Sequence, residues 1–172
     1  MPEGVAGVSP HKCTQMGAGP PRLSGTVVTK VTVTNQRTMA TIFTKIINGE
    51  IPSYIIAENE HFFSFLDINP VSRGHTLVIP KKEIDYLFDL EDAELGELMI
   101  FAKSVAHAID KALSPMRTGV LVDGREVPHA HVHLVPIYSE NQKTALGQKV
   151  EVSKEEMVRL AEQIGNAWEP PL

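Results

Sequence analysis

One stretch decides how this chain folds: Val127-Pro128-His129-Ala130-His131-Val132-His133-Leu134-Val135-Pro136. Its three histidines alternate with small or apolar residues, and a β-strand sends successive side chains to opposite faces. If the stretch is a strand, the three imidazoles share one face, with neighbours roughly 7 Å apart at the backbone. A core strand gains little from such a row, because each ring needs partners for two nitrogens. We therefore expect the row to have a function.

Three explanations compete for the row of histidines. A polar face turned to water is disfavoured, because the flanking residues Val127, Leu134 and Ile137 suit an interior strand. A metal site is the second explanation, since His at positions i and i+2 of a strand can hold zinc. Three same-face positions spread along a strand, however, and do not converge on one point. The third explanation is nucleophilic catalysis at phosphorus, where a neutral imidazole attacks and its neighbours orient it and offset negative charge.

The segment His-Ala-His-Val-His-Leu-Val resembles the His-φ-His-φ-His-φ-φ signature of the histidine-triad (HIT) nucleotide hydrolases and transferases, and the resemblance extends from about Ala40 to Ile137. It implies that the middle histidine, His131, attacks the α-phosphorus of a nucleotide ester or amide. A nucleotidyl-histidine would form, and water would release the mononucleotide. By the same resemblance, His129 would fix the tautomer and orientation of His131. His133 would contact phosphate and assist proton transfer to the leaving group.

Composition narrows the class of protein. The chain has 172 residues, enough for one domain with a substantial core, and a formal charge of −5, which argues against general nucleic-acid binding. Cys13 is the one cysteine, so neither an intrachain disulfide nor a cysteine-based zinc site is expected. No apolar run is long enough to span a membrane. These features fit the cytoplasm, where thiols stay reduced.

Residues 1–38 differ from the rest, with many Gly, Pro, Ser and Thr residues and a net charge of +3. We expect a disordered N-terminal extension, followed by a HIT-like domain over residues 39–172. The alternating run Thr26 to Thr34 leaves open an added edge strand. A transit peptide and a natural start at Met39 are further alternatives.

The segment after Ala40 predicts a short helix from Ile42 to Ile47, ended by Asn48-Gly49. In the family that this segment resembles, the Ile-Phe pair lines the base pocket, which assigns Ile42 and Phe43 to nucleotide binding. Many relatives also carry Cys-x-x-Cys here and a histidine after Pro-Lys-Lys, as part of a structural zinc site. This chain has Thr41, Thr44 and Glu83 at those positions, so we predict no structural zinc.

The segment Phe65-Leu66-Asp67-Ile68-Asn69-Pro70 carries the expected ribose site. A carboxylate can accept hydrogen bonds from both hydroxyls of a ribose diol, and the resemblance gives this role to Asp67. Phe65 and Ile68 would flank the base or the sugar. For His75, which opens the next strand, we expect a satisfied core histidine, with support of the catalytic residues as the alternative.

The turn Asp123-Gly124-Arg125-Glu126 precedes the triad and departs from the family pattern, which has a longer loop containing Asn and Gln. Backbone amides at Gly124 can still hold a phosphate. Arg125 either adds a bidentate phosphate contact or points to solvent. Glu126 would repel phosphate, so we expect it to face away. Asp123 does not replace the missing Asn, because a carboxylate cannot donate a hydrogen bond.

The remaining pattern gives the fold class, α+β, with an antiparallel sheet of about five strands. A long helix over Glu91 to Leu113 packs on the sheet, with Asp89 as a candidate cap. A C-terminal helix opens at the capping box that begins with Ser153. Related proteins dimerise partly through the long helix, so we expect a homodimer. Trp168 is a weak candidate for shaping leaving-group specificity.

The sequence therefore predicts a nucleotide hydrolase that cleaves a purine nucleoside 5′-phosphoramidate or a related adenylate without a metal or other cofactor. The presence of His133, rather than the Gln typical of the uridylyltransferase branch, favours water as the acceptor. Three alternatives stay open. They are a dinucleoside polyphosphate hydrolase, a nucleotide-binding interaction module without turnover, and a zinc-binding strand protein.

Overall fold

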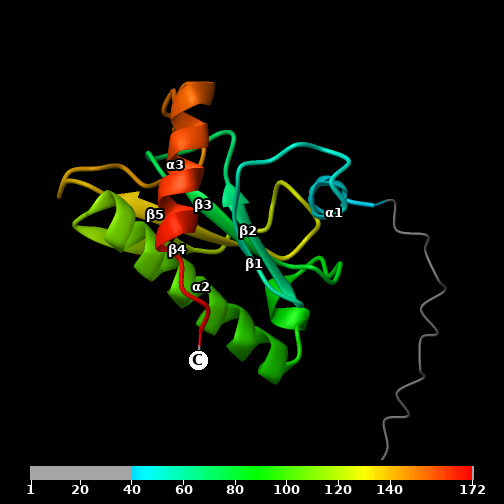
Figure 1. The fold of residues 1–172 in the computed structure, drawn as a ribbon. Coiled ribbons are helices and arrows are strands. Elements are labelled where there is room, and N and C mark those ends of the chain that lie inside the picture. Colours follow the sequence, from blue (N-terminus) through cyan, green and yellow to red (C-terminus); the bar gives the residue numbers. More distant parts are fainter. Residues whose placement is uncertain (1–39, 172) are drawn as a thin grey trace, which may run out of the picture. The chain divides into compact units, whose positions relative to one another are not determined.

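The fold is a five-stranded antiparallel sheet with three α-helices, as seen in a computed structural model that describes residues 40–171 (Figure 1). The expected extension, residues 1–38, lies outside the described residues. The strands run in the order β1-β2-β3-β5-β4. Their bounds are β1 Ile55–Glu58, β2 Phe62–Leu66, β3 Thr76–Pro80, β4 Arg117–Leu121 and β5 Val132–Ile137, and the helices are α1 Ile42–Ile47, α2 Asp92–Leu113 and α3 Lys154–Ala167. This arrangement confirms the predicted α+β class.

The sheet has two different faces. On one face, Ala130, Val132 and Leu134 pack with α2 and α3, which Figure 1 shows crossing in front of the sheet. On the other face, α1 places Phe43 over a smaller apolar cluster drawn from β2 and β3. The odd-numbered residues of the histidine stretch lie on this second face, because the strand alternates.

The ends of the helices follow local chemistry, with one exception. Ser153 caps α3 by accepting the Glu156 backbone N–H at 3.2 Å, as the capping box predicted. The predicted cap of α2 is wrong, because Asp89 lies in a short 3₁₀ turn and Glu91 is the N-cap, without a side-chain hydrogen bond. Ser114 ends α2 in the left-handed region at φ 49°. None of the helices in residues 40–171 is long and apolar enough to cross a membrane.

A glycine lies where the turn before β3 meets the end of α2. Gly74 has φ +83°, and a Cβ placed there would overlap the tip of the Leu113 side chain. A larger residue would therefore be strained by the backbone conformation and would force the Leu113 side chain to move. His75 follows directly, just before β3.

Candidate active site

The three histidines gather on one face, although only His133 belongs to the regular strand. β5 begins at Val132, and its ladder pairs His133 with Leu77 of β3 and with Leu121 of β4. The rings of His129 and His131 lie 5.7 and 5.4 Å from the ring of Phe43. All three histidines are buried, with exposures of 0%, 4% and 7% in chain order. The predicted shared face is thus present, with an irregular start.

His129 has a partner for each ring nitrogen. Its Nε2 lies 2.8 Å from the carbonyl oxygen of Pro80, and its Nδ1 lies 3.0 Å from Thr41 Oγ1. A carbonyl can only accept, so Nε2 carries the hydrogen. Burial is the main reason why the pKa of His129 is lowered, and the Pro80 contact opposes this shift. The ring is fixed in place and cannot reach a ligand.

His131 has the tautomer that a nucleophile needs. Its Nδ1 lies 2.7 Å from the backbone carbonyl oxygen of His129, so Nδ1 is the donor and Nε2 keeps its lone pair. The contact that sets this tautomer comes from the main chain of His129, not from its ring. The ring of Phe43 packs edge-on against His131 and restrains its rotation.

His133 lines the pocket and has a hydrogen-bond partner on only one of its two ring nitrogens among the described residues. The Val71 backbone N–H donates to His75 Nδ1 at 3.3 Å, so Nε2 of His75 carries the hydrogen and donates to His133 Nδ1 at 3.0 Å. The remaining nitrogen, Nε2 of His133, then bears hydrogen and is buried without a partner among the described residues. Burial, with His131 and His75 nearby, lowers the pKa of His133 to about 3. The ring is therefore neutral and can donate to a ligand oxygen.

The position of His75 fits both of its interpretations, a satisfied buried histidine and a support for the histidines of the triad. It is buried at 1% exposure, bonds to His133, and has Nδ1 3.5 Å from Asp67 Oδ2. Burial lowers its pKa, against the opposing effect of Asp67. The sequence could not show this contact, because the pairing of β3 with β5 joins segments 58 residues apart.

A small pocket, of about 60 Å³, opens over the triad. It brings His131 and His133 together with three of the predicted nucleotide-binding residues, Asp67, Gly124 and Arg125. Gly124 has φ +72°, which suits the tight turn before the triad. The Arg125 guanidinium pairs with Asp123 and its side chain is 82% exposed. Further lining residues that the sequence analysis did not assign to the site are Asn69, Val71, Asp123, Glu126, Leu146, Gly147 and Lys149.

Several predicted residues lie elsewhere or behave differently. Phe65 is buried against Phe43, whereas Ile42 and Ile68 are exposed, and none of these lines the pocket. Glu126, which we expected to face away, lies among the lining residues. Asp67 Oδ1 accepts the Asn69 backbone N–H at 2.8 Å, and each carboxylate oxygen can still accept another bond.

Trp168 does not lie at the pocket. Its indole N–H donates to Ser104 Oγ at 2.9 Å, and its ring packs against Phe101 of α2. Trp168 therefore holds the end of α3 against α2 and has no contact with the triad.

Thr41, Thr44 and Glu83, which stand where many relatives carry zinc ligands, do not fit a zinc ion. Thr41, Thr44 and Glu83 lie together beside His129, and the two hydroxyls bond to each other at 3.0 Å. Zinc sites in proteins use Cys sulfur, His nitrogen or carboxylate oxygen, and a threonine hydroxyl is not among these ligands. The donor set therefore argues against a structural metal here.

A second group of possible ligands is Asp67, His75 and His133, whose ligand atoms lie within 4.8 Å of one another. The facing nitrogens of His75 and His133 bond to each other, and Asp67 approaches the opposite nitrogen of His75. The nitrogens through which His75 and His133 face each other are thus already used in a hydrogen bond. The three side chains fit a hydrogen-bonded row better than a metal site.

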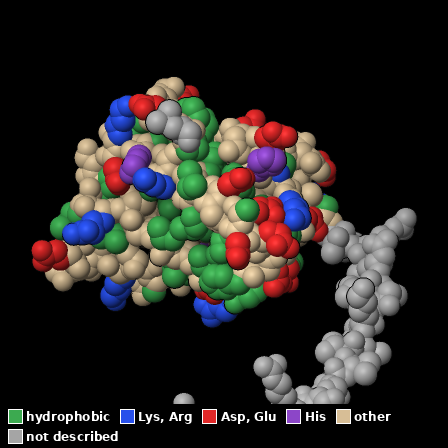
Figure 2. Space-filling view, turned by 90° about the horizontal axis from the view of Figure 1, so that it is seen from below, with side chains coloured by type: hydrophobic (Ala, Val, Ile, Leu, Met, Phe, Trp, Pro, Cys, Tyr) green, Lys and Arg blue, Asp and Glu red, His purple; other side chains and the backbone are tan. Residues whose placement is uncertain are grey.

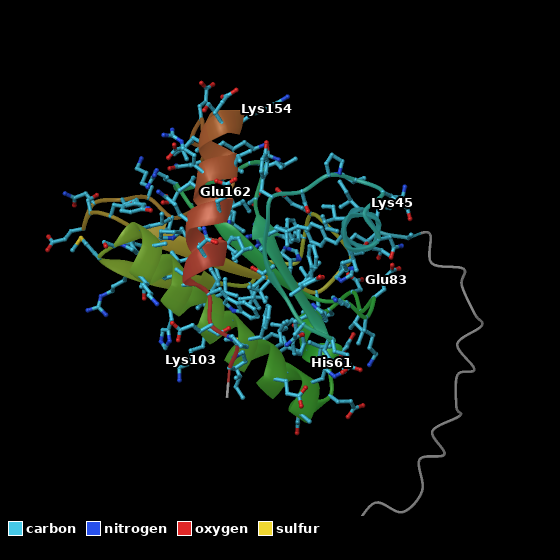
Figure 3. The ribbon with its side chains drawn as sticks, viewed as in Figure 1. Lys45, His61, Glu83, Lys103, Lys154 and Glu162 are labelled. Carbon is cyan, nitrogen blue, oxygen red and sulfur yellow. The ribbon has the colours of Figure 1, made fainter. Side chains whose placement is uncertain are left out.

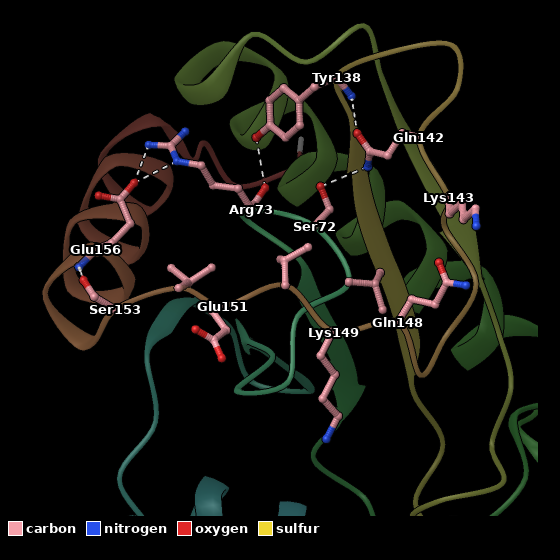
Figure 4. A pocket seen from close by; sticks show the side chains of 13 residues that line it. Ser72, Arg73, Tyr138, Gln142, Lys143, Gln148, Lys149, Glu151, Ser153 and Glu156 are labelled. Atoms are coloured by element: carbon pink, nitrogen blue, oxygen red, sulfur yellow. Dashed lines mark hydrogen bonds and ion pairs between the residues drawn. The ribbon is translucent and has the colours of Figure 1, made fainter.

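A larger hollow, about 640 Å³, lies beside the triad pocket and shares Val71 and Lys149 with it (Figure 4). Its polar groups mostly bond to one another. Gln142 donates to Ser72 Oγ, Tyr138 donates to the backbone of Arg73, and Arg73 pairs with Glu156. Because these bonds leave few groups for a ligand, the small pocket over His131 and His133 is the better candidate site.

A row of three buried histidines beside a small pocket, on an α+β sheet, is the arrangement expected from the resemblance to the histidine-triad proteins. The HIT domain model matches residues 48–140, and the chain belongs to the HIT family. An uncharacterized HIT-like protein of Methanocaldococcus jannaschii is 36% identical over 69% of this chain and 95% of its own length. An adenosine 5′-monophosphoramidase of Saccharomyces cerevisiae is 37% identical over 63% of this chain and 69% of its own. A HIT-like protein structure from Bartonella henselae has a TM-score of 0.65 at 30% identity, covering 74% and 95%.

Proposed function

We propose that this protein hydrolyses nucleoside 5′-phosphoramidates or related adenylates to nucleoside monophosphates, through a nucleotidyl-histidine formed on His131. The observation that carries the proposal is that one pocket is lined by both His131 and His133. His131 Nε2 keeps its lone pair, and the Nε2–H of His133 has no partner among the described residues. The similarity to the yeast adenosine 5′-monophosphoramidase supports the substrate class. The pocket residues Asp67 and Gly124 support binding of ribose and phosphate.

The first step forms a bond between His131 Nε2 and the α-phosphorus and breaks the bond from phosphorus to the leaving nitrogen. That nitrogen needs a proton to leave as an amine. His133 is neutral in the empty pocket, because its pKa is about 3. An anionic phosphate next to the ring favours its charged form, so His133 binds a proton with the substrate and passes it to the leaving nitrogen.

The second step reverses these roles. Water attacks phosphorus, the bond to His131 Nε2 breaks, and the proton of the water returns to neutral His133. His75 stays in contact with the His133 ring in both steps, but the direction of the contact changes. When His133 is neutral, His75 Nε2–H donates to His133 Nδ1. When His133 carries the added proton, its Nδ1–H donates to His75 Nε2, and the hydrogen of His75 lies on Nδ1, beside Asp67 Oδ2. No step requires a metal ion.

The size of the pocket indicates how the nucleotide lies. Pockets for small ligands usually enclose roughly 300–1,000 Å³, whereas the cavity over the triad holds about 60 Å³. The phosphate alone fills such a space. We infer that the nucleoside lies along the opening, with Asp67 at the ribose and the exposed side chains of Ile42 and Ile68 near the base.

A direct assay separates this proposal from its alternatives. Purified protein is incubated with adenosine 5′-phosphoramidate and, separately, with diadenosine polyphosphates, with and without a chelator, and AMP is measured. Release of AMP from the phosphoramidate with chelator present supports the proposal. Preference for the dinucleotide favours a polyphosphate hydrolase, loss with chelator favours a metal mechanism, and AMP binding without turnover favours an interaction module.

A homodimer belongs to the same proposal. β4 is an edge strand with Val120 and Leu121 exposed, and α2 exposes Met99 and Ile100. Figure 2 shows hydrophobic side chains in the middle of the face seen from below. Apolar side chains beside an unpaired edge suit pairing with a second copy. Sedimentation at micromolar concentration should give twice the mass of one chain, and a monomer would contradict the proposal. A cytoplasmic location and a boundary near residue 39 remain predictions.

A further inference from the structure

A chain of polar side chains leads from the surface to the buried side of the triad. Thr41 Oγ1 lies 3.0 Å from His129 Nδ1 and 3.0 Å from Thr44 Oγ1, and the Thr44 hydroxyl donates to Glu83 Oε2. Figure 3 shows Glu83 beside α1, the helix that carries Thr44. Glu83 is half-buried, whereas His129 has no exposed surface. The chain therefore joins a group near water to one that water cannot reach.

The hydrogens in this chain can be counted. There are three side-chain contacts in a row, His129 to Thr41, Thr41 to Thr44, and Thr44 to Glu83. His129 Nε2 already uses one hydrogen on the Pro80 carbonyl. With a neutral imidazole and an ionised carboxylate, only the two threonine hydroxyls remain as side-chain donors. If Thr41 donates to His129 and Thr44 to Glu83, the contact between the two hydroxyl oxygens has no hydrogen, although Thr41 Oγ1 also accepts the Thr44 backbone N–H at 3.1 Å. The row of three side-chain contacts is therefore one proton short.

Adding one proton satisfies every contact in either of two ways. In one arrangement, a His129 imidazolium donates to Thr41, Thr41 to Thr44, and Thr44 to the Glu83 carboxylate. In the other, a protonated Glu83 donates to Thr44, Thr44 to Thr41, and Thr41 to a neutral His129. Both contain the same number of protons and differ only in which oxygen or nitrogen each hydrogen is bonded to.

We propose that Glu83, Thr44 and Thr41 form a proton-sharing chain, in which one proton is common to the Glu83 carboxyl group and the His129 ring. The three are positioning residues, because none of them lines the substrate pocket.

The charges around His129 are consistent with this chain. The ionisable groups that act on the ring are Glu83, which raises its pKa, and His131, which lowers it. The two lysines nearest to Glu83 in sequence are engaged elsewhere, since Lys81 pairs with Glu58 and Lys82 with Glu94. Glu83 is therefore the group through which a proton reaches the buried ring.

The consequence for turnover rests on the proposed function. A proton taken up by the chain puts positive charge behind His131 and weakens its Nε2 as a nucleophile. We therefore expect kcat to fall as the pH drops below the value at which the chain takes up its proton. The substitution Glu83→Gln supplies a permanent donor, the side-chain amide, so the chain is complete with a neutral His129 and no added proton.

The test is a titration of the His129 ring by nitrogen-15 NMR in the full chain, without substrate, from pH 4 to 8. Glu83→Gln should lower the pH at which His129 binds a proton by about one pH unit or more, since an opposite charge is lost. Asp85→Asn, which removes an exposed carboxylate two residues away, is the matched control and should cause no change. Equal titration curves for the parent and Glu83→Gln would overturn the proposal, as would an equal shift in the control.

A second pair of variants tests the same chain in case Glu83→Gln does not fold. Thr44→Ser keeps the hydroxyl and should titrate like the parent, whereas Thr44→Val breaks the chain and should shift His129 in the same direction as Glu83→Gln. Equal behaviour of the serine and valine variants would also contradict the chain. If His129 titrates as expected but the phosphoramidate is not cleaved, the chain stands and the proposed function fails.

Discussion

His129 and His133 lie two residues before and two residues after His131 in the sequence, yet their ring nitrogens have different surroundings. Both are buried and burial lowers both pKa values. His129 has partners on both nitrogens, from Pro80 and Thr41. Among the described residues His133 has one partner, His75, and its other nitrogen is buried without one. The comparison shows that the chemistry of an imidazole is set by the atoms that face its two nitrogens, not by its burial.

The centre of the comparison, His131, should give the largest effect. His131→Ala removes the lone pair that attacks phosphorus, so turnover of adenosine 5′-phosphoramidate should fall by about 10³-fold or more. AMP affinity should stay within about tenfold, because the main role of the ring is bond formation. Steady-state kinetics and calorimetric AMP titration measure the two quantities. Turnover at the parent rate would exclude His131 as the nucleophile.

The next largest effect is expected at His133, whose Nε2–H is proposed to take part in proton transfer. His133→Ala removes the N–H that faces the leaving group, and kcat should fall by about 10²-fold, the lower range for loss of a general acid. His133→Gln keeps an N–H donor and should lose less. Kinetics with the phosphoramidate compare the two variants. An unchanged kcat in His133→Ala would mean that the unpartnered nitrogen has no role in proton transfer.

Acid should destabilise the folded protein, because His129, His133 and also His75 are buried as neutral rings. Burial lowers the pKa of His129 and His75 below 6.5 and that of His133 to about 3. Below pH 6.5 the unfolded chain then binds more protons, so the free energy of unfolding falls between pH 6.5 and 3. Each group contributes up to about 1.4 kcal/mol per pH unit.

Urea unfolding at a series of pH values measures this slope. Above pH 6.5 the stability from these histidines is fully present, and the loss should begin below that value. The exposed His107 is the matched control, since His107→Gln should leave the slope unchanged. A free energy of unfolding that is constant from pH 7 to 4 would contradict the buried, neutral state of the three rings.

The smallest effect is expected at Arg125. Its guanidinium is bonded to Asp123 and its side chain is 82% exposed, so it contributes little to a bound phosphate. Solvent screens an exposed ion pair of this kind, so it holds the side chain only weakly. Arg125→Ala should therefore change KM by less than about fivefold. A loss near 100-fold would show that Arg125 leaves Asp123 and binds the phosphate.

The sequence alone gave the α+β class, the shared face of the three histidines, the short helix at Ile42 and the cap at Ser153. These depend on periodicity and on hydrogen bonds between neighbours in the chain, which the order of residues specifies. The cap at Asp89 was wrong because three candidate acids, Asp89, Glu91 and Asp92, stand within four residues and local chemistry does not separate them.

Only the tertiary structure decided what each histidine touches. The contact of His75 with His133 and the chain from Glu83 to His129 join segments that are 58 and 46 residues apart. Such contacts depend on which strands pair and on where α1 is placed over the sheet. The order of residues therefore determined which groups are available for chemistry, and the packing determined which nitrogen of each ring is open to a ligand.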